Sequence, residues 1–439
     1  MSSADCRYAP AHGLRGSHVK PTDEDEASSV APAGRDDPGE IGRDPVRLSR
    51  RAFLGGTAAL ACVGAIAPFS FVRSSRAGTL RLARFVREQR RLAMTPGISV
   101  AVVRGEETVF STGAGWADRE HEIRTTPDTV FMLASVSKTV TCAGVMALVE
   151  DGLLDLDTDV NDYLPFEVRV PAAPEAPVTV RMLLTHTSAI RDRSAVWGRP
   201  YSDPTLYFHG DAPIALGDFL RSYLVPGEDE YRAGANFYER RPGKAYAYSN
   251  IAVALAGYVA EVVASQDFNE LCKERILVPL GMDQSGFRLA DITTPNLAMP
   301  YRLDQQAGTF EPYFQYGYPD YPDGALRTSA VHLARWLGAF MNFGTFDSVR
   351  VLNRSTIREI RREQLPYPAS WHQGLIWYGA APRGYFRMGH TGGDFGVSTR
   401  MFFRPDRRIG VVSLANAYLP GRRWDAFRAI DLKVFDEFQ

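Results

Sequence analysis

One stretch of the chain, from Phe131 to Gly152, is apolar on almost every side. Its residues after Val140 are mostly Ala, Val, Met and Leu, and the run stops at Gly152. A helix that is apolar all round lies buried in a protein core, and glycine commonly follows a helix C-terminus. We therefore predict a core helix here, against which the rest of the chain must pack.

Ser135 and Lys138 stand near the start of this predicted helix, three residues apart and therefore on one face. Ser is a common helix N-cap, but a capping box would place Glu or Gln at position 138. Burial near the positive end of the helix dipole should lower the pKa of Lys138. Such an amine suits proton exchange with a neighbouring serine. The spacing alone is weak support, because Ser17 and Lys20 repeat it in a polar tail.

Two later motifs also combine polar residues with the boundaries of predicted elements. Tyr248-Ser249-Asn250 precedes an apolar helical pattern, where Ser249 or Asn250 is also a good N-cap. The segment 389–393, Gly-His-Thr-Gly-Gly, follows a predicted strand. Its glycines fit a turn, and they equally allow a substrate to lie close to the backbone.

The composition excludes several classes of protein. The 439 residues are 45% hydrophobic and 23% charged, with a net charge of -1, which is typical of a globular domain and gives no reason to expect nucleic-acid binding. The four cysteines are far apart, so no disulfide framework is predicted. The chain contains neither an H-E-x-x-H zinc motif nor a G-x-S-x-G nucleophile elbow. We predict no metal site and no cofactor.

The N-terminal part is predicted to lie outside the folded domain. Residues 1–45 are polar and rich in Pro and Gly, so we expect no fold there. Residues 46–77 resemble a twin-arginine export signal, with Arg50 and Arg51 followed by small apolar residues from 55 to 67. That apolar run is too short for a comfortable membrane span.

Residues 65–67 and 75–77 each fit a signal cleavage site, and an uncleaved signal anchor is the competing interpretation. The export signal predicts the twin-arginine machinery as a partner and a periplasmic or secreted location. We expect no stable membrane span after cleavage.

From residue 78 to residue 439 the pattern predicts one α+β domain. Strands occur near both ends of this region and helices dominate its middle, which favours an antiparallel sheet built from both chain ends and flanked by helices. The sheet parts are predicted at about 79–150 and 325–439, with a mostly helical insertion at about 151–324. The predicted strands cover 97–103, 108–113, 385–388, 397–403 and 409–414, and the predicted helices 80–92, 179–186, 250–263, 267–277, 329–342 and 424–435. We expect helix 250–263 to be amphipathic, 189–246 to be irregular and 301–321 to form an aromatic loop.

Together and in this order, the three motifs resemble those of the serine β-lactamase and penicillin-binding-protein family. The likeness is closest to its class C, DD-peptidase and esterase branch, which is similar to peptidase family S12. It extends to residues 96–115, 183–188 and 276–282, and covers nearly all of 79–439. The resemblance implies a β-lactamase/transpeptidase-like fold.

The resemblance also implies roles for individual residues. Ser135 is the expected nucleophile that forms an acyl-enzyme. Lys138 and Tyr248 are expected to handle its proton, with Tyr248 as the base for the incoming water. Asn250 is expected to position the substrate together with Lys138.

A second group of residues is expected to bind the substrate. His390, Thr391 and Gly392 would line the strand against which the substrate docks. The backbone N–H groups of Ser135 and Gly393 would form the oxyanion hole. The two tyrosine-rich segments, 201–238 and 301–321, would wall the cleft, or simply pack between the sheet and the helical part.

The chain departs from the family pattern at two positions. His390 stands where classical β-lactamases have Lys, which removes a permanent cation that would hold a substrate carboxylate. Ala189 stands where Gly commonly follows the segment 185–188, which we interpret as structural. The first change favours ester or peptide hydrolysis over penicillin hydrolysis.

The expected function is therefore that of a secreted serine hydrolase that acts on an ester or amide. The activity would be that of an esterase, a D-amino-acid peptidase or DD-carboxypeptidase, or a β-lactamase. The alternative is a catalytically silent binding protein for cell-wall peptides. A silent homologue would be expected to have lost Ser135, Lys138 or Tyr248, and this chain keeps all three.

Overall fold

The computed structural model describes residues 76–193, 195–196, 199–200, 207–366, 371–381 and 384–438. The predictions for residues 1–75, including the N-terminal extension and most of the export signal, lie outside the described residues. Within the described part of the chain, no single helix is both long and apolar enough to cross a membrane.

The fold is organised around one antiparallel sheet with eight strands in the described part of the chain. Strands from the two chain ends are neighbours in its middle, where Ile98 pairs with Ala415. This arrangement confirms the predicted sheet. The strand order is β14 (Trp371–Gln373), β15 (Tyr378–Ala380), β16 (Arg387–Asp394), β17 (Val397–Arg404), β18 (Ile409–Ala415), β1 (Gly97–Arg104), β2 (Glu107–Asp118) and β3 (Ile123–Arg124).

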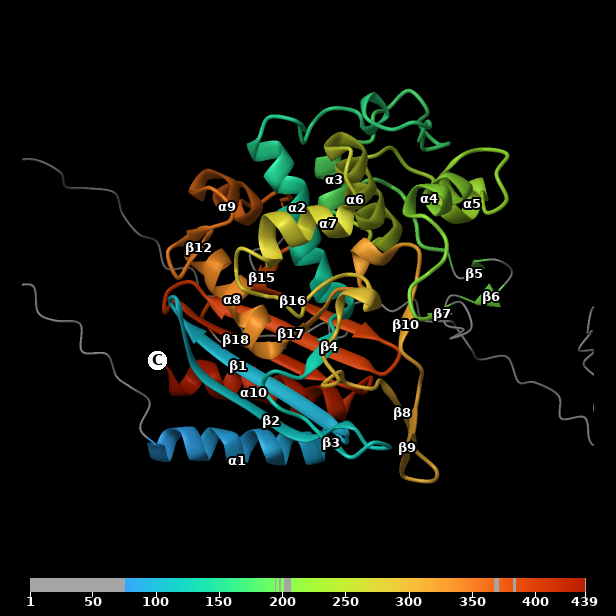
Figure 1. Ribbon diagram of the computed structural model, residues 1–439. Coiled ribbons are helices and arrows are strands. Elements are labelled where there is room, and N and C mark those ends of the chain that lie inside the picture. The colour runs from blue at the N-terminus through green and yellow to red at the C-terminus, as the bar shows by residue number, and fades with distance from the viewer. Residues whose placement is uncertain are drawn as a thin grey trace, which may run out of the picture.

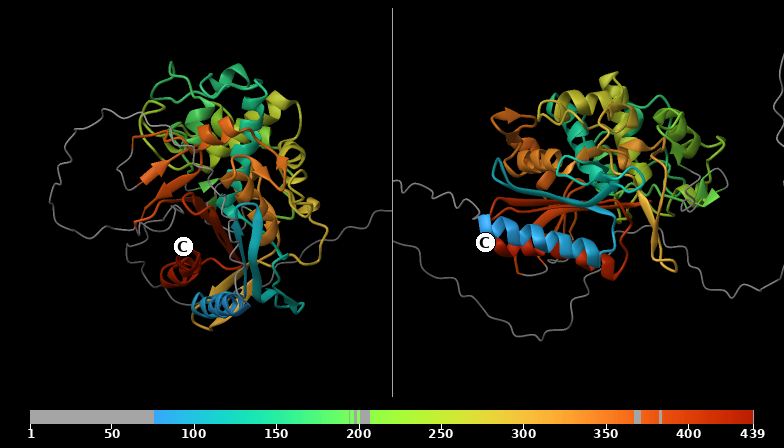
Figure 2. Two further views of the ribbon diagram at one scale, coloured as in Figure 1. Left: turned by 90° about the vertical axis from the view of Figure 1, so that its left-hand side faces the viewer. Right: turned by 60° about the horizontal axis from the view of Figure 1, so that its bottom comes forward.

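Two helices cover one face of this sheet, namely α1 (Arg76–Leu92) and α10 (Arg422–Glu437). They lie side by side beneath the strands in Figure 1 and in both views of Figure 2. Because side chains alternate along a strand, Val100 and Val102 pack towards these helices, while Ala101 packs into the core on the opposite face.

The opposite face carries the larger hydrophobic core, which is built on α2 (Lys138–Glu150), α6 (Asn250–Ala264) and α8 (Ala330–Met341) (Figure 1). Every residue of α2 from Lys138 to Leu148 is buried, which confirms the predicted core helix. A 3-10 turn, Ala134–Ser137, precedes α2, and Gly152 follows it with a φ of 73°. That left-handed conformation favours glycine.

The predicted helices and strands recur with shifted bounds and three errors. Helix α6 is not amphipathic, because its residues from Ile251 to Gly257 are all buried. The segment 189–246 is not wholly irregular, since it contains α4 (Leu216–Leu224). The segment 301–321 is not a loop throughout, because β8 (Tyr301–Asp304) and β9 (Thr309–Pro312) form a hairpin there. Strand β16 also begins later than predicted and runs through the His-Thr-Gly motif.

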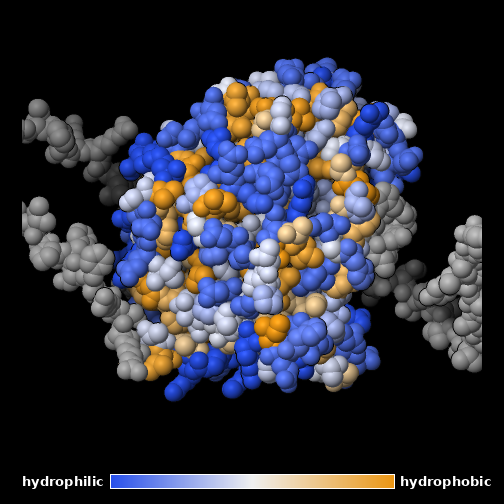
Figure 3. Space-filling model, in the orientation of Figure 1, coloured by the Kyte–Doolittle hydropathy of each residue, from blue (hydrophilic) through white to orange (hydrophobic). Residues whose placement is uncertain are grey.

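Hydrophilic side chains cover most of the face seen in Figure 3, and apolar ones form small separate patches.

The remaining elements connect the layers of the fold. The short helices are α3 (Val180–Leu184), α5 (Ala233–Asn236), α7 (Phe268–Cys272), a π-helical turn (Lys273–Leu277), α9 (Arg354–Arg361) and 3-10 turns at Val160–Asp162, Leu289–Asp291 and Tyr321–Asp323. The short strand pairs are β4 (Val130–Met132) with β11 (Arg327–Ser329), β5 (Ala195–Val196) with β6 (Arg199–Pro200), β7 (Phe208–His209) with β10 (Tyr316–Gly317), and β12 (Thr345–Phe346) with β13 (Val349–Arg350).

Candidate active site

The segment that carries Ser135 is held directly against strands β16 and β17. The Thr399 hydroxyl donates to the Leu133 carbonyl at 2.6 Å. A Cβ atom at Gly392 would collide with the same carbonyl and lie 3.0 Å from the Ser135 nitrogen, so only glycine allows this close approach. Ala134 adopts a left-handed φ of 48° just before Ser135, a strained conformation that is common at functional sites.

The Lys138 ammonium lies at the centre of the site and is fully buried. Its Nζ donates to the Ser135 hydroxyl at 3.1 Å and to Asn250 Oδ1 at 2.7 Å. It also donates to the backbone carbonyl of Asp323 at 2.7 Å and lies 3.4 Å from that residue's carboxylate. The serine, the lysine and the asparagine singled out in the sequence therefore converge.

The expectation of a lowered pKa for Lys138 is wrong. Burial disfavours the ammonium, but the Asp323 carboxylate and the Tyr248 phenol outweigh this effect and raise the pKa of Lys138. The sequence argument considered only burial and the helix dipole. It could not include Asp323, which lies 185 residues further along the chain.

Tyr248 approaches the same centre from the N-terminus of α6. Its hydroxyl is in hydrogen-bond contact with both Ser135 and Lys138, and its ring centroid lies 5.1 Å from the Lys138 Nζ. Burial raises the pKa of Tyr248, and the neighbouring ammonium offsets only part of that rise. Tyr248 is therefore a neutral phenol at neutral pH.

His390 lies on β16 across from Tyr248, with ring centroids 6.5 Å apart. Its Nδ1 donates to the Thr391 carbonyl at 2.6 Å, which leaves Nε2 as an acceptor. Burial and the nearby Lys138 lower the pKa of His390 to about 3. His390 is thus uncharged at neutral pH and supplies no cation to the site.

Strand β16 presents an open edge beside these side chains. Strand β15 pairs with it only from Arg387 to Gly389, whereas β16 continues to Asp394. From His390 to Asp394, the edge that faces away from β17 has no strand partner in the described part of the chain. Backbone N–H and C=O groups on such an edge can pair with an extended ligand.

Comparison with known proteins adds an independent observation. The model of the Beta-lactamase family matches residues 82–434 of this chain. The chain belongs to the Beta-lactamase family. The motifs that contribute Ser135, Lys138, Tyr248 and His390 all lie within the matched region.

Three proteins that are similar to this chain share 20 to 25% of its sequence. Protein Rv1367c of Mycobacterium tuberculosis is 25% identical over 369 residues, which cover 79% of this chain and 86% of that protein. EstCE1, described as a hydrolase with promiscuous acyltransferase activity, has a TM-score of 0.64 and 21% identity, and covers 80% of this chain and 98% of its own. The D-amino acid amidase of Ochrobactrum anthropi SV3 has a TM-score of 0.63 and 20% identity, with 81% and 97% covered. These structural likenesses show a β-lactamase/transpeptidase-like fold.

Two carboxylates of this family member were not singled out in the sequence. Asp192 accepts hydrogen bonds from the Ser249 hydroxyl at 2.9 Å and from the Asn250 and Ile251 N–H groups at 2.8 and 3.1 Å. It therefore caps α6 and orients the residues beside Tyr248. Asp323 pairs with Lys138, as described above. Asp192 comes from an irregular segment and Asp323 from a short 3-10 turn, so no periodic pattern marks either residue.

The segment 185–188, which we interpreted as structural, packs against Tyr248 and Ser249. The His186 ring packs on the Tyr248 ring with centroids 4.4 Å apart, and its Nδ1 accepts the Ser249 N–H at 3.3 Å. Burial lowers the pKa of His186 well below its usual value, so this ring is neutral. Ala189 follows with a left-handed φ of 63°.

The aromatic-rich segments meet at the far end of β16. Tyr207 packs edge-on against Tyr316 and Tyr318, with ring centroids 4.9 and 5.3 Å apart. The Tyr207 hydroxyl donates to the Asp394 carboxylate at 3.2 Å. Burial raises the pKa of Asp394 to about 6. Trp197 and Tyr201, which precede Tyr207 in the first aromatic-rich segment, lie outside the described residues.

Thr391 contacts an aromatic pair on the neighbouring strands. Its hydroxyl lies 3.1 Å from the Tyr378 hydroxyl, and the Tyr378 ring stacks on the Trp371 ring with centroids 4.8 Å apart. These rings lie beside the point on β16, just after Gly389, at which the pairing with β15 stops.

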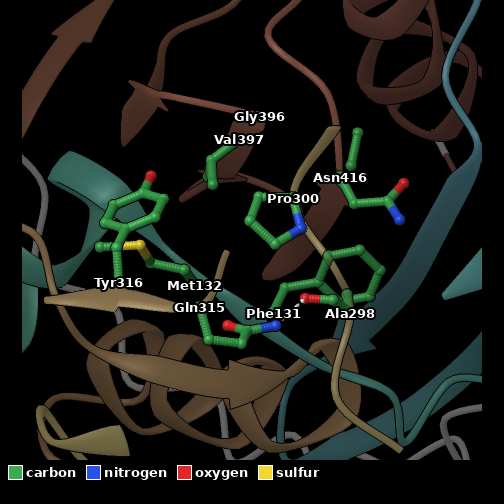
Figure 4. Close-up of a pocket in the computed structure, with 10 residues that line it drawn as sticks. Phe131, Met132, Ala298, Pro300, Gln315, Tyr316, Gly396, Val397 and Asn416 are labelled. Carbon is green, nitrogen blue, oxygen red and sulfur yellow. Dashed lines mark hydrogen bonds between the residues drawn. The ribbon is translucent and has the colours of Figure 1, made fainter. Parts of the chain in front are cut away.

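A small cavity lies behind the serine-bearing segment, between Phe131, Met132 and Tyr316 (Figure 4). Its volume of about 10 Å³ is close to the space that one water molecule needs. It is too small to receive a substrate.

Proposed function

We propose that this protein is a serine hydrolase that cleaves an ester or amide through a covalent acyl-enzyme on Ser135. One observation carries the proposal. The Ser135 hydroxyl contacts both the Lys138 ammonium and the Tyr248 phenol at the open edge of a strand. A serine becomes an effective nucleophile when a fixed partner can take its proton.

In the acylation step, the Ser135 Oγ attacks the substrate carbonyl carbon and an Oγ–C bond forms. The serine proton passes to the Tyr248 oxygen, while the phenol proton passes to the leaving alcohol or amine as its bond to carbon breaks. This relay suits a phenol that is neutral at rest. Lys138 stays protonated and stabilises the negative charge that develops on Oγ.

The backbone N–H groups of Ser135 and Gly393 are the proposed oxyanion hole, in which one donor contributes a factor of about 100 to 1,000 in rate. Asn250 is proposed to hold the substrate's ester or amide group, with its own amide fixed by Lys138. His390, Thr391 and Gly392 are proposed to line the edge along which the acyl chain lies.

Deacylation reverses the relay with water in place of the leaving group. Water attacks the acyl carbon, its proton passes to Tyr248, and the phenol proton returns to Ser135 Oγ as the acyl bond breaks. The products are the free acid and the enzyme with Ser135 and Tyr248 in their starting protonation states.

An uncharged His390 favours substrates without a carboxylate beside the scissile bond. Simple esters and amides, including D-amino-acid derivatives, are therefore proposed over penicillins. The similar fold of a D-amino acid amidase and of EstCE1, a hydrolase with promiscuous acyltransferase activity, supports this choice. The export signal expected in residues 46–77 would place this activity outside the cytoplasm.

The test is labelling of the purified protein with a fluorophosphonate probe, followed by a panel of p-nitrophenyl esters, D-amino-acid amides and nitrocefin. We expect labelling of the wild type, loss of labelling in Ser135→Ala, and a fall of more than about 1,000-fold in kcat/KM for the best substrate.

Ser137→Ala is the matched control, because Ser137 is a buried serine two residues away that accepts the Leu326 N–H at 3.1 Å. Labelling should persist in that variant. A folded wild-type protein that neither reacts with the probe nor cleaves any member of the panel would overturn the proposal.

A further inference from the structure

The Lys138 side-chain nitrogen is surrounded by oxygen atoms that can accept hydrogen bonds from an ammonium. Its Nζ faces the Ser135 hydroxyl, Asn250 Oδ1 and the Asp323 carbonyl within 3.1 Å. An ammonium can donate to all three oxygens. The Asp323 carboxylate beside it raises the pKa of Lys138 and so favours this charged form.

A buried ammonium needs a counterion, since an isolated buried charge is strongly disfavoured. The Asp323 carboxylate provides it, with Oδ2 at 3.4 Å from Nζ. The side chain of Asp323 is itself about 8% exposed, and its Oδ1 has no hydrogen-bond partner. The ammonium is thus the main compensation that the carboxylate receives.

The other titratable groups around Lys138 do not take over this role. Tyr248 is a neutral phenol, and the rings of His186 and His390 are uncharged at neutral pH. The Asp192 carboxylate is engaged by the N-terminal N–H groups of α6. Asp394, at the end of β16, receives hydrogen bonds from Tyr207 and from the Phe395 N–H.

We propose that Asp323 is a positioning residue of the hydrolase, whose carboxylate keeps Lys138 protonated and fixed against Ser135 and Asn250. This inference rests on the proposed function. Its consequence is a division of labour, in which Lys138 remains a fixed cation throughout the cycle. Tyr248 alone then moves protons between Ser135, the leaving group and water.

The first test uses Asp323→Asn, which keeps the backbone carbonyl and the side-chain shape but removes the charge. Without the carboxylate, the pKa of Lys138 should fall, because a neighbouring opposite charge shifts a pKa by about 1 to 3 units. In a profile of kcat/KM against pH with a neutral p-nitrophenyl ester, the alkaline limb should move down by a similar amount.

Asp394→Asn is the matched control, since burial raises the pKa of both Asp323 and Asp394 to about 6, but Asp394 makes no contact with Lys138. Its alkaline limb should stay at the wild-type position. A profile of Asp323→Asn that is merely scaled down, with its limb unshifted, would mean that Asp323 supports only the fold.

The second test needs no activity. Lys138→Met should lower the Tm at pH 8, because it leaves the Asp323 carboxylate buried without a counterion. Adding Asp323→Asn to Lys138→Met should raise the Tm again, although Asp323→Asn alone lowers it. Additive losses in the double variant would refute the counterion role.

The two levels of proposal fail in different ways. A wild type without probe labelling overturns the hydrolase mechanism, whatever the Tm values are. The role of Asp323 alone is overturned if the wild type is labelled on Ser135, the alkaline limb of Asp323→Asn is unshifted, and the Tm losses of Lys138→Met and Asp323→Asn are additive.

Discussion

At the scale of single residues, the site is defined by which groups carry charge. Lys138 is an ammonium beside the Asp323 carboxylate, so this pair is close to neutral as a unit. His390 occupies the substrate edge as an uncharged ring, because its pKa is about 3. The open edge of β16 therefore offers hydrogen bonds without a permanent positive charge.

Placing a cation at this edge should change substrate preference. We expect His390→Lys to raise the ratio of kcat/KM for nitrocefin to kcat/KM for a neutral ester by about tenfold or more. Hydrogen bonds to charged groups contribute about 1.5 to 3 kcal/mol, and 1.4 kcal/mol corresponds to tenfold. Steady-state kinetics on both substrates measure the ratio, and an unchanged ratio would show that position 390 does not select for carboxylates.

The site residues differ in how far the sequence could predict them. Ser135, Lys138, Tyr248 and His390 belong to motifs with characteristic spacing, and the structure brings them together. The ionisation of Lys138 could not be predicted, because its counterion Asp323 comes from a 3-10 turn that no local pattern ties to α2. The pKa of a buried group depends on such long-range neighbours.

At the scale of elements, the turn between α3 and Asp192 is under backbone strain. His186 and Ala189 adopt left-handed φ values of 57° and 63°. This turn carries the ring that packs on Tyr248 and leads to the Asp192 cap of α6. The strain is therefore stored next to the residues that orient the phenol.

Glycine at position 189 should relieve part of this strain. A left-handed conformation costs an L-residue about 1 to 2 kcal/mol. Glycine avoids this cost but loses more chain entropy on folding, which offsets about 0.5 to 1 kcal/mol of the gain. We expect Ala189→Gly to stabilise the fold by about 0.5 to 1 kcal/mol, measured as a higher midpoint of urea unfolding. Ala215→Gly is the control and should destabilise, because φ at Ala215 is an ordinary -64°.

Elements with strong periodicity were predicted well, and weaker signals were missed. The spacing of Leu216, Phe219, Leu220 and Tyr223 is helical and marks α4, but the surrounding aromatic residues obscured it. Strands β8 and β9 are joined by a turn in which the Asp304 carboxylate accepts two backbone N–H groups. The prediction of a loop there is wrong because aromatic residues also favour strands.

At the scale of the whole molecule, α10 is fastened to the sheet by a buried ion pair. Arg400 on β17 donates to the Asp431 carboxylate at 2.6 Å, and both side chains are at most 3% exposed. The pair lies on the face opposite to α2 and the Ser135 segment. It joins the C-terminal helix to the layer that carries the substrate edge on its other side.

Removing one partner of this pair should destabilise the whole fold. We expect Asp431→Asn to cost about 3 to 5 kcal/mol, because it leaves the Arg400 charge buried and unpaired. The exposed pair of Arg241 with Glu175 provides the control, where Glu175→Gln should cost less than about 1 kcal/mol. Urea unfolding measures both, and equal losses would contradict the argument from burial.

The pairing of β1 with β18 has a consequence for synthesis of the protein. A ribosome that adds about 5 to 20 residues per second needs roughly 15 to 60 s to travel from one strand to the other. During that interval the edge of β1 that later pairs with β18 has no strand partner from this sheet, and an unpaired apolar edge is a template for aggregation. Nascent chains that stall before Ile409 should therefore depend on chaperones, and releasing them early should yield insoluble material rather than a smaller folded domain.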